Sequence, residues 1–314
     1  MILTVTLNAA LDITYAVPRL RAHGEHRVTD VAERPGGKGV NVARVLAALG
    51  HGAVVTGFAG GPTGAVLRDR LAALAGGVTD ALVTIAGTTR RTVGVVDAES
   101  GATTQFNEPG PAVTAAEWSA FTDVYGQLLR EASAVALCGS LPPGVPVGTY
   151  AQLIREAHAA GVPTLLDTSG EPLRRGIAAR PDIVKPNAAE LAGLTGSTEP
   201  LRAARDARRR GAHAVAASLG PDGMLAVTSE GVWRATPPRR LKGNPTGAGD
   251  SAVAGLLSGL VEGLPWPERL ARAVALATAT VRAATAGEFD RTTYEELAGK
   301  VAVGGEPTGQ GRAG

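Results

Sequence analysis

The sequence predicts an α/β protein in which a mostly parallel sheet is sandwiched by helices, with a small second sheet beside it. From about residue 113 onwards, short apolar runs alternate with helix-length segments, an order typical of parallel strands that helices cover on both faces. Two earlier segments, 12–34 and 89–108, instead show the alternating, turn-rich pattern of exposed strands. We expect these two segments to pair into the small sheet.

The individual elements are expected along the chain as follows. Residues 2–7 are a short β-branched run closed by Asn8, which is the pattern of a buried first strand. Further strands are predicted at 134–138, 164–167, 183–185 and 214–218, and helices at 149–160, 201–211, 250–263 and 267–284. The tail 304–314 is polar and rich in glycine, so we expect it to be disordered and a single domain to cover residues 1–303.

The composition excludes several classes of function. Of the 314 residues 44% are apolar, which is enough for one large core, and a formal charge of +2 gives no sign of a nucleic-acid or membrane surface. No apolar run approaches the roughly 20 residues that cross a bilayer. The single Cys138 cannot form an intrachain disulfide, and the first residues lack the features of a signal peptide. We therefore expect a soluble, cytoplasmic protein whose partner is a small molecule.

The strongest chemical signal is a glycine-rich turn followed at once by an apolar helix of small residues. Its backbone N–H groups can converge on one point, to which the helix N-terminus adds partial positive charge. Gly247, Ala248 and Gly249 therefore predict an anion hole. Asp250 alone would be an ordinary helix cap, but beside an anion hole it can also accept the proton of an attacking hydroxyl. As a solvated aspartate it would have a pKa of about 4.

A second glycine-rich segment runs from Pro35 into another apolar helix. It is not a Walker A loop, because Lys38 is followed by Gly39, and it lacks the third glycine of a dinucleotide fingerprint. Taken alone it could be a flexible turn. Lys38 and Asn41 at a helix start are also suited to gripping a sugar and its phosphate.

These segments together resemble a known family. The Gly-Gly-Lys-Gly-x-Asn segment that begins at Gly36 and the Thr-Gly-Ala-Gly-Asp segment that ends at Asp250 resemble the paired signatures of the PfkB (ribokinase-like) carbohydrate kinases. The agreement covers nearly the whole chain, in the right order, at residues 8–12, 139–144, 167–170, 184–190 and 218–223. The resemblance implies a ribokinase-like fold in which the small sheet is a lid. Such lids often pair across a dimer, so we expect a homodimer through the lid.

The resemblance also implies an activity. Lys38, the segment Asn8–Asp12 and the loop 139–144 are similar to the subgroup that contains 1-phosphofructokinase and tagatose-6-phosphate kinase, which act on hexoses that already carry a phosphate. ATP and Mg²⁺ would be the cofactors. Fructose 1-phosphate, phosphorylated at its 6-hydroxyl, is the first choice of substrate, and tagatose 6-phosphate or fructose 6-phosphate, phosphorylated at the 1-hydroxyl, comes next. The intact Asp250 argues against a sensor on the same fold that binds without turnover.

The resemblance assigns roles to individual residues. The sugar would be held at its hydroxyls by Asp12 and Asn41, through the backbone by Gly37, and at its phosphate by Lys38, Arg90 and Ser140, with Arg91 able to share or replace the role of Arg90. The nucleotide would be bound by Lys185, Asn187, Ser218, Gly220 and Gly223, and Mg²⁺ would be organised, through water, by Asn187 and Glu190. The anion hole would be Gly247, Ala248 and Gly249, and the catalytic base would be Asp250.

Four other features of the sequence bear on these assignments. Gly287–Glu288 departs from the Gly-Thr often found there in the family, which leaves the adenine contacts open. His23 and His26 lack the further ligands of a zinc site. The arginines at 205 and 208–210 favour a solvated helix face over a nucleic-acid site. The segment 167–170 resembles the active-site turn of an aspartic protease, but only one such turn is present.

Overall fold

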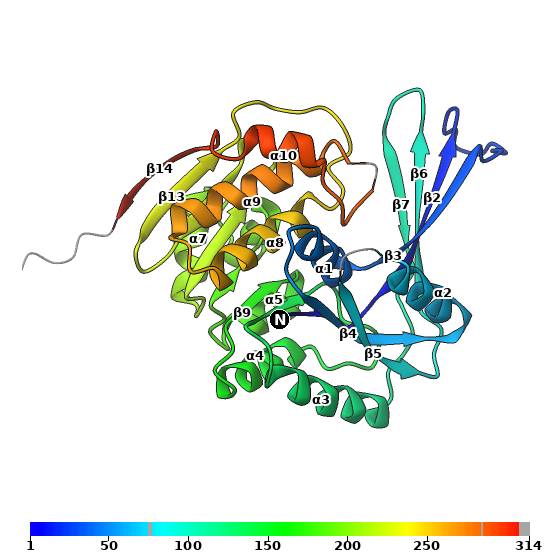
Figure 1. Ribbon diagram of the computed structural model, residues 1–314, viewed down its shortest axis with the longest axis horizontal. Coiled ribbons are helices and arrows are strands. Elements are labelled where there is room, and N and C mark those ends of the chain that lie inside the picture. The colour runs from blue at the N-terminus through cyan, green and yellow to red at the C-terminus, as the bar shows by residue number, and fades with distance from the viewer. Residues whose placement is uncertain (75–76, 284, 308–314) are drawn as a thin grey trace, which may run out of the picture.

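The computed structural model describes residues 1–74, 77–283 and 285–307 and is built around one large sheet (Figure 1). The strands of this sheet are β1 (Ile2–Thr6), β4 (Ala53–Gly60), β5 (Val78–Ile85), β8 (Ala134–Cys138), β9 (Thr164–Asp167), β10 (Ile183–Val184), β11 (Ala214–Ser218), β12 (Met224–Val227), β13 (Gly231–Thr236) and β14 (Ala302–Pro307). Within the described residues their order is β14-β13-β12-β11-β10-β9-β8-β1-β4-β5. Neighbours from β11 to β5 are parallel, and the pairs from β11 to β14 are antiparallel. The carboxyl ends of the parallel strands therefore share one edge.

Helices cover both faces of the sheet (Figure 1). One face carries α1 (Lys38–Ala48), α2 (Gly61–Ala72), α8 (Ala248–Val261), α9 (Trp266–Thr280) and α10 (Arg291–Leu297); the other carries α3 (Ala115–Leu129), α4 (Thr149–Ala159), α5 (Gly170–Ile177), α6 (Ala188–Thr195) and α7 (Pro200–Arg209). Successive side chains of a strand point to opposite faces, so in β8 Ala136 joins the first core and Val135 and Leu137 join the second. None of the helices in the described part of the chain is long and apolar enough to span a membrane.

A second, four-stranded sheet projects from the main body (Figure 1). Its strands are β2 (Ala10–Val17), β3 (Asp30–Gly36), β6 (Arg90–Asp97) and β7 (Thr103–Asn107), in the order β3-β2-β6-β7. The central pair, β2 and β6, is parallel, and each outer pair is antiparallel. The prediction that segments 12–34 and 89–108 pair into a small sheet is confirmed. We call this sheet the lid.

The register of the lid gives its two faces different characters. Asp12 lies opposite Thr92, and both side chains line the cavity described below, so this face is polar. The residues that alternate with them lie opposite one another on the outer face. That face carries the apolar side chains of Ile13, Tyr15, Val31, Val93, Val95 and Phe106. Val31 is 55% exposed and Phe106 is 60% exposed, so the outer face is only partly covered within the chain.

The expected bounds hold closely except at the C-terminal ends. The strands predicted at 134–138, 164–167 and 214–218 are confirmed, and the helix expected from Asp250 begins two residues earlier, at Ala248. The helix expected to reach residue 284 ends at Thr280, and residue 284 lies outside the described residues.

The prediction that the chain ceases to pack at residue 304 was wrong. Gly304 and Gly305 lie in β14 and pair with Arg234 and Trp233 of β13. Pairing uses backbone groups that glycine also has, so the lack of side chains does not prevent it. The part of the expected tail at 308–314 lies outside the described residues.

Candidate active site

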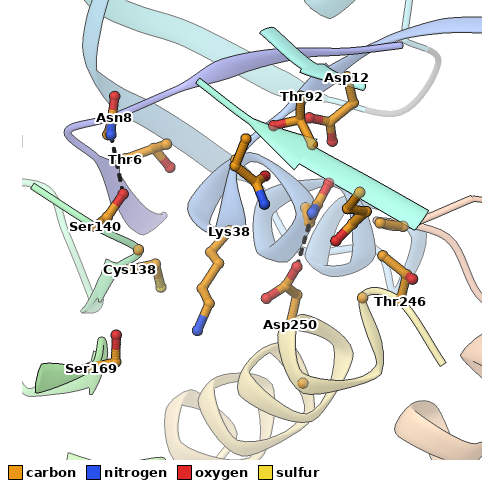
Figure 2. Close-up of a pocket in the computed structure, with 18 of the residues that line it drawn as sticks. Thr6, Asn8, Asp12, Lys38, Thr92, Cys138, Ser140, Ser169, Thr246 and Asp250 are labelled. Carbon is orange, nitrogen blue, oxygen red and sulfur yellow. Dashed lines mark hydrogen bonds between the residues drawn. The ribbon is translucent and has the colours of Figure 1, made fainter. Parts of the chain in front are cut away.

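A cavity of about 740 Å³ opens at the carboxyl edge of the parallel strands, against the polar face of the lid (Figure 2). Ligands of open α/β sheets bind at this edge. The cavity brings together most of the predicted site residues, namely Asp12, Gly37, Lys38, Asn41, Arg90, Ser140, Lys185, Asn187, Glu190, Ser218, Gly247, Gly249 and Asp250. A second cavity of about 610 Å³ shares Asn187, Ser218 and Gly249 with the first and adds Gly220, Gly223 and Ala248.

Asp250 lies in the first turn of α8, beneath the start of α1 (Figure 2). The Nδ2 of Asn41 donates a hydrogen bond of 2.8 Å to its Oδ2. Burial raises the pKa of Asp250 to about 6, and the nearby charge of Lys38 opposes that rise. The expectation of a solvated carboxyl group with an ordinary pKa was therefore wrong. A buried carboxylate with this pKa is a stronger base and is still ionised at neutral pH.

The turn before α8 depends on Gly247. Its φ of 85° lies in the left-handed region that favours glycine, and a Cβ here would lie 2.8 Å from the Cα of Ala286. The N–H of Ala248 donates to the carbonyl oxygen of Pro245 at 3.1 Å, and the helical hydrogen bonds begin at the N–H of Ser251. Between them, the N–H groups of Gly249 and Asp250 have no acceptor in the described part of the chain, so these two are free to bind an anion. The N–H of Ala248, which was predicted to belong to the anion hole, is already used within the turn.

Two lysines meet at one buried carboxylate beside the anion hole. The Nζ of Lys38 lies 3.1 Å, and that of Lys185 3.5 Å, from Oδ1 of Asp167, whose side chain is fully buried. Burial works against the charge of Lys38, but the carboxylates of Asp167, Asp250 and Glu190 raise its pKa overall. Lys38 therefore stays cationic across the physiological range. Asp167 was not predicted as a site residue, although it stands in a motif that carried the family resemblance.

At the lid end of the cavity, a carboxylate and a guanidinium face each other. Burial raises the pKa of Asp12 to about 6, and the charge of Arg90 opposes that rise. Arg90 donates from Nε to the carbonyl oxygen of Asn8 at 3.1 Å and from a terminal nitrogen to that of Glu108 at 3.3 Å. Arg91 instead turns outward, is 55% exposed and pairs with the carboxylate of Glu108 at 2.7 Å. The structure thus brings Arg90, and not Arg91, into the cavity.

Asn8 is a cavity residue that sequence reasoning did not assign. Its Nδ2 donates to Oγ of Ser140 at 3.1 Å, as Figure 2 shows, and to the carbonyl oxygen of Pro109 at 3.1 Å. The side chain therefore ties the end of β1 to the loop after β8 and to the base of the lid. The signal in the sequence was the Asn8–Asp12 motif itself.

The other end of the cavity begins at α6. Asn187 caps this helix: its Oδ1 accepts from the N–H of Glu190, and Oε2 of Glu190 accepts from the N–H of Asn187, each at 2.8 Å. A backbone bridge joins Asn187 to Ser218 at the end of β11. The predicted nucleotide residues therefore lie side by side where the two cavities meet.

The same pair was predicted to organise Mg²⁺ through water. In the described part of the chain, no group of three or more His, Cys, Asp or Glu side chains is placed to hold a metal ion. Mg²⁺ in kinase sites keeps several waters and takes only one or two carboxylates, with substrate phosphates supplying further oxygens. One carboxylate and one amide oxygen, from Glu190 and Asn187, both lining the cavity, fit that mode of binding.

This combination of fold and site defines a class of protein. The carboxylate of Asp250 lies beside free helix N–H groups and near the cationic side chains of Lys38 and Lys185, at the carboxyl edge of a mostly parallel sheet. Such a site belongs to a phosphotransferase with an alcohol group as acceptor. The pfkB family carbohydrate kinase model matches residues 5–292, and the chain belongs to that family. PfkB kinases use ATP.

Individual relatives agree in fold and sequence. A 1-phosphofructokinase from Rhodobacter capsulatus is 41% identical over 283 residues, covering 88% of this chain and 89% of the relative. One from Xanthomonas campestris is 38% identical over 322 residues, covering 97% and 98%. Phosphofructokinase-2 from Escherichia coli in complex with fructose-6-phosphate has a TM-score of 0.85 at 33% identity, covering 94% and 98%. The tetrameric inhibited form of that enzyme has a TM-score of 0.85 at 32% identity with the same coverage.

Proposed function

We propose that this kinase is a 1-phosphofructokinase, which transfers the γ-phosphate of ATP to the 6-hydroxyl of fructose 1-phosphate and releases fructose 1,6-bisphosphate and ADP. The observation that carries the proposal is the position of Lys38 and Arg90 in the same cavity as Asp250. Two cationic groups at the sugar end favour an acceptor that already carries a phosphate. The two curated relatives with this activity support the choice of sugar.

The mechanism follows from the chain's own groups. Asp250 orients the acceptor hydroxyl and takes its proton as the new O–P bond forms. Free N–H groups at the start of α8 stabilise the charge on the transferred phosphoryl group. Lys185 lies beside this point, since a Cβ at Gly249 would be 3.5 Å from its Nζ, and it holds the nucleotide phosphates.

The remaining roles are assigned by position in the cavity. Asn41 lines the cavity beside Asp250, to which its Nδ2 donates, and this position suits it to bind a sugar hydroxyl next to the base. Asp12 and the backbone at Gly37 bind the sugar from the lid side, and Ser140 adds a hydroxyl to the phosphate site. Mg²⁺, held through water by Asn187 and Glu190, would neutralise charge on the nucleotide phosphates.

The test is ADP release with ATP and Mg²⁺ against fructose 1-phosphate, fructose 6-phosphate, tagatose 6-phosphate and fructose. We expect the highest kcat/KM on fructose 1-phosphate, and a loss of about 10²-fold or more in kcat for Asp250→Asn, with sugar phosphate binding retained. A preference for fructose 6-phosphate, for which the Escherichia coli complex is the structural precedent, or for tagatose 6-phosphate would replace the proposed substrate. Binding without turnover on every sugar would establish a sensor.

We further propose that the protein acts as a cytoplasmic homodimer joined through its lids. The outer lid face carries apolar side chains, of which Val31 and Phe106 are exposed, and β3 and β7 are the edge strands of the lid sheet. Uncovered edges and apolar faces of this kind are usually paired or shielded in stable proteins. A second copy of the same lid supplies a matching apolar surface.

A further inference from the structure

The segment from Thr285 to Glu288 passes directly behind the anion hole. Gly247 packs so closely on Ala286 that a Cβ on Gly247 would lie 2.8 Å from its Cα. Gly287, with a φ of 77°, packs on the other side against α1, where a Cβ would lie 2.9 Å from Oδ1 of Asn41. This short segment therefore lies between the turn that forms the anion hole and the side chain of Asn41, which donates to Asp250.

One buried arginine fixes the segment in place. Arg44 is 6% exposed and lies one helical turn beyond Asn41 on α1. One terminal nitrogen donates to the carbonyl oxygen of Ala286 at 2.8 Å, and the other to Oε1 of Glu288 at 2.7 Å. The same carboxylate oxygen also accepts from Arg34 of the lid strand β3 at 3.4 Å. The side chain of Glu288 thus links α1, the lid strand β3 and its own segment, residues 285–288.

We propose that Glu288 is a positioning residue for phosphoryl transfer. Its carboxylate neutralises the buried guanidinium of Arg44 and aims it at the Ala286 carbonyl, which keeps the segment pressed against Gly247 and Asn41. Without that carboxylate, the buried guanidinium loses its nearest counter-charge and must rearrange or draw in water. The segment then shifts, and displacements of even about 1 Å near a reacting group are costly to the rate. This inference rests on the proposed phosphoryl transfer.

A merely structural ion pair would behave differently. Because Glu288 is 38% exposed, water can reach the position of the lost carboxylate and limit the cost in stability of leaving Arg44 without its partner. We therefore expect its loss to reduce turnover far more than stability. The chain offers a matched control in Glu262, which is 36% exposed, accepts from Arg272 at 2.6 Å and His51 at 3.1 Å, and caps the opposite end of α8.

The experiment compares Glu288→Gln with Glu262→Gln in the ADP-release assay, on whichever sugar phosphate the unmodified protein turns over. For Glu288→Gln we expect kcat to fall about tenfold, with the KM for ATP and for the sugar phosphate within about twofold. Glu262→Gln should keep kcat within about twofold. Melting curves followed by circular dichroism should show similar stability losses for the two variants.

The inference is overturned if kcat falls less than about threefold, if it falls equally in both variants, or if only KM changes. Each of these outcomes leaves the proposed function standing. If Glu288→Gln does not fold, Arg44→Lys decides by the same criteria, because a lysine keeps the charge but cannot donate in two directions from a planar fork. No turnover by the unmodified protein on any sugar phosphate would overturn the proposed function and this inference with it.

Discussion

At the scale of single residues, the site buries two carboxyl groups away from water, those of Asp12 and Asp250. Burial raises the pKa of both Asp12 and Asp250 to about 6. The sequence locates both aspartates by their motifs but does not indicate their burial. For Asp250 that burial depends on α1 lying over the start of α8, a contact between residues 209 positions apart. The local pattern around Asp250 predicts a helix start, and only the assembled fold turns it into a buried base.

The buried charge of Asp250 should cost stability. A pKa that rises from 3.8 to about 6 means that the folded protein binds this proton more tightly than the unfolded chain does. Stability is therefore lost as pH rises from about 4 through 6, by up to about 3 kcal/mol. Asp250→Asn removes that cost and keeps an acceptor for Asn41. We expect the variant to be more stable than the unmodified protein at pH 7, with the difference vanishing near pH 4, in urea unfolding followed across this range.

The control for this prediction is an aspartate of the opposite kind. Asp290 caps α10, and hydrogen bonds from the side chain and backbone of Thr293 lower its pKa. Asp290→Asn should therefore not stabilise the protein at pH 7, because its charge is favourable in the folded state. Equal stability of Asp250→Asn and the unmodified protein at pH 7 would mean that the carboxylate is not buried at a cost.

At the scale of elements, the same capping box begins α3, away from the cavity, and α6, at the cavity. In α3, Thr114 and Glu117 exchange hydrogen bonds with each other's backbone, and in α6 Asn187 and Glu190 do the same. Sequence reasoning placed Asn187 and Glu190 at the cofactor site and did not identify the cap. The two roles are compatible, because each side chain that closes the helix also lines the cavity.

Comparing the two caps separates stability from activity. Thr114→Ala and Asn187→Ala should each cost about 1 kcal/mol of unfolding free energy, because each exposes an unpaired helix N–H. Only Asn187→Ala should lower kcat/KM, by about tenfold or more, and raise the Mg²⁺ concentration needed for half the maximal rate. Urea unfolding and Mg²⁺ titrations of the rate measure the two effects. If Asn187→Ala behaves like Thr114→Ala in both, the role of Asn187 is confined to capping.

The elements themselves were largely predictable. Buried strands such as Ala134–Cys138 and Ala214–Ser218 are continuous apolar runs, and turns bound them in the sequence. Several apolar elements, among them β4, β12 and α3, were not assigned from the sequence, and β14 was missed because its pairing leaves no apolar signal. Strand β14 contains Gly304 and Gly305, and only the partner strand β13 makes these residues part of the sheet.

At the scale of the whole molecule, the site is assembled from segments that only the topology brings together. The glycine motifs were recognisable because each is contiguous. The link from Arg44 to Glu288 joins residues 244 positions apart, and the sequence showed only that Gly287–Glu288 departs from the family pattern. The two faces of the lid likewise depend on the register of four strands, which sets Asp12 and Thr92 toward the cavity and the apolar set outward.

The outer lid face carries the last prediction. If two copies pair there, Phe106→Glu combined with Val31→Glu should raise the dimer dissociation constant at least about a hundredfold, because each charge enters a twofold interface twice. Sedimentation equilibrium should then give the monomer mass at concentrations where the unmodified protein has the dimer mass. Val147→Glu alters a residue that is 41% exposed and not part of the lid, and should leave the dimer intact. A monomeric unmodified protein, or a dimer that survives both lid substitutions, would place the contact elsewhere or remove it.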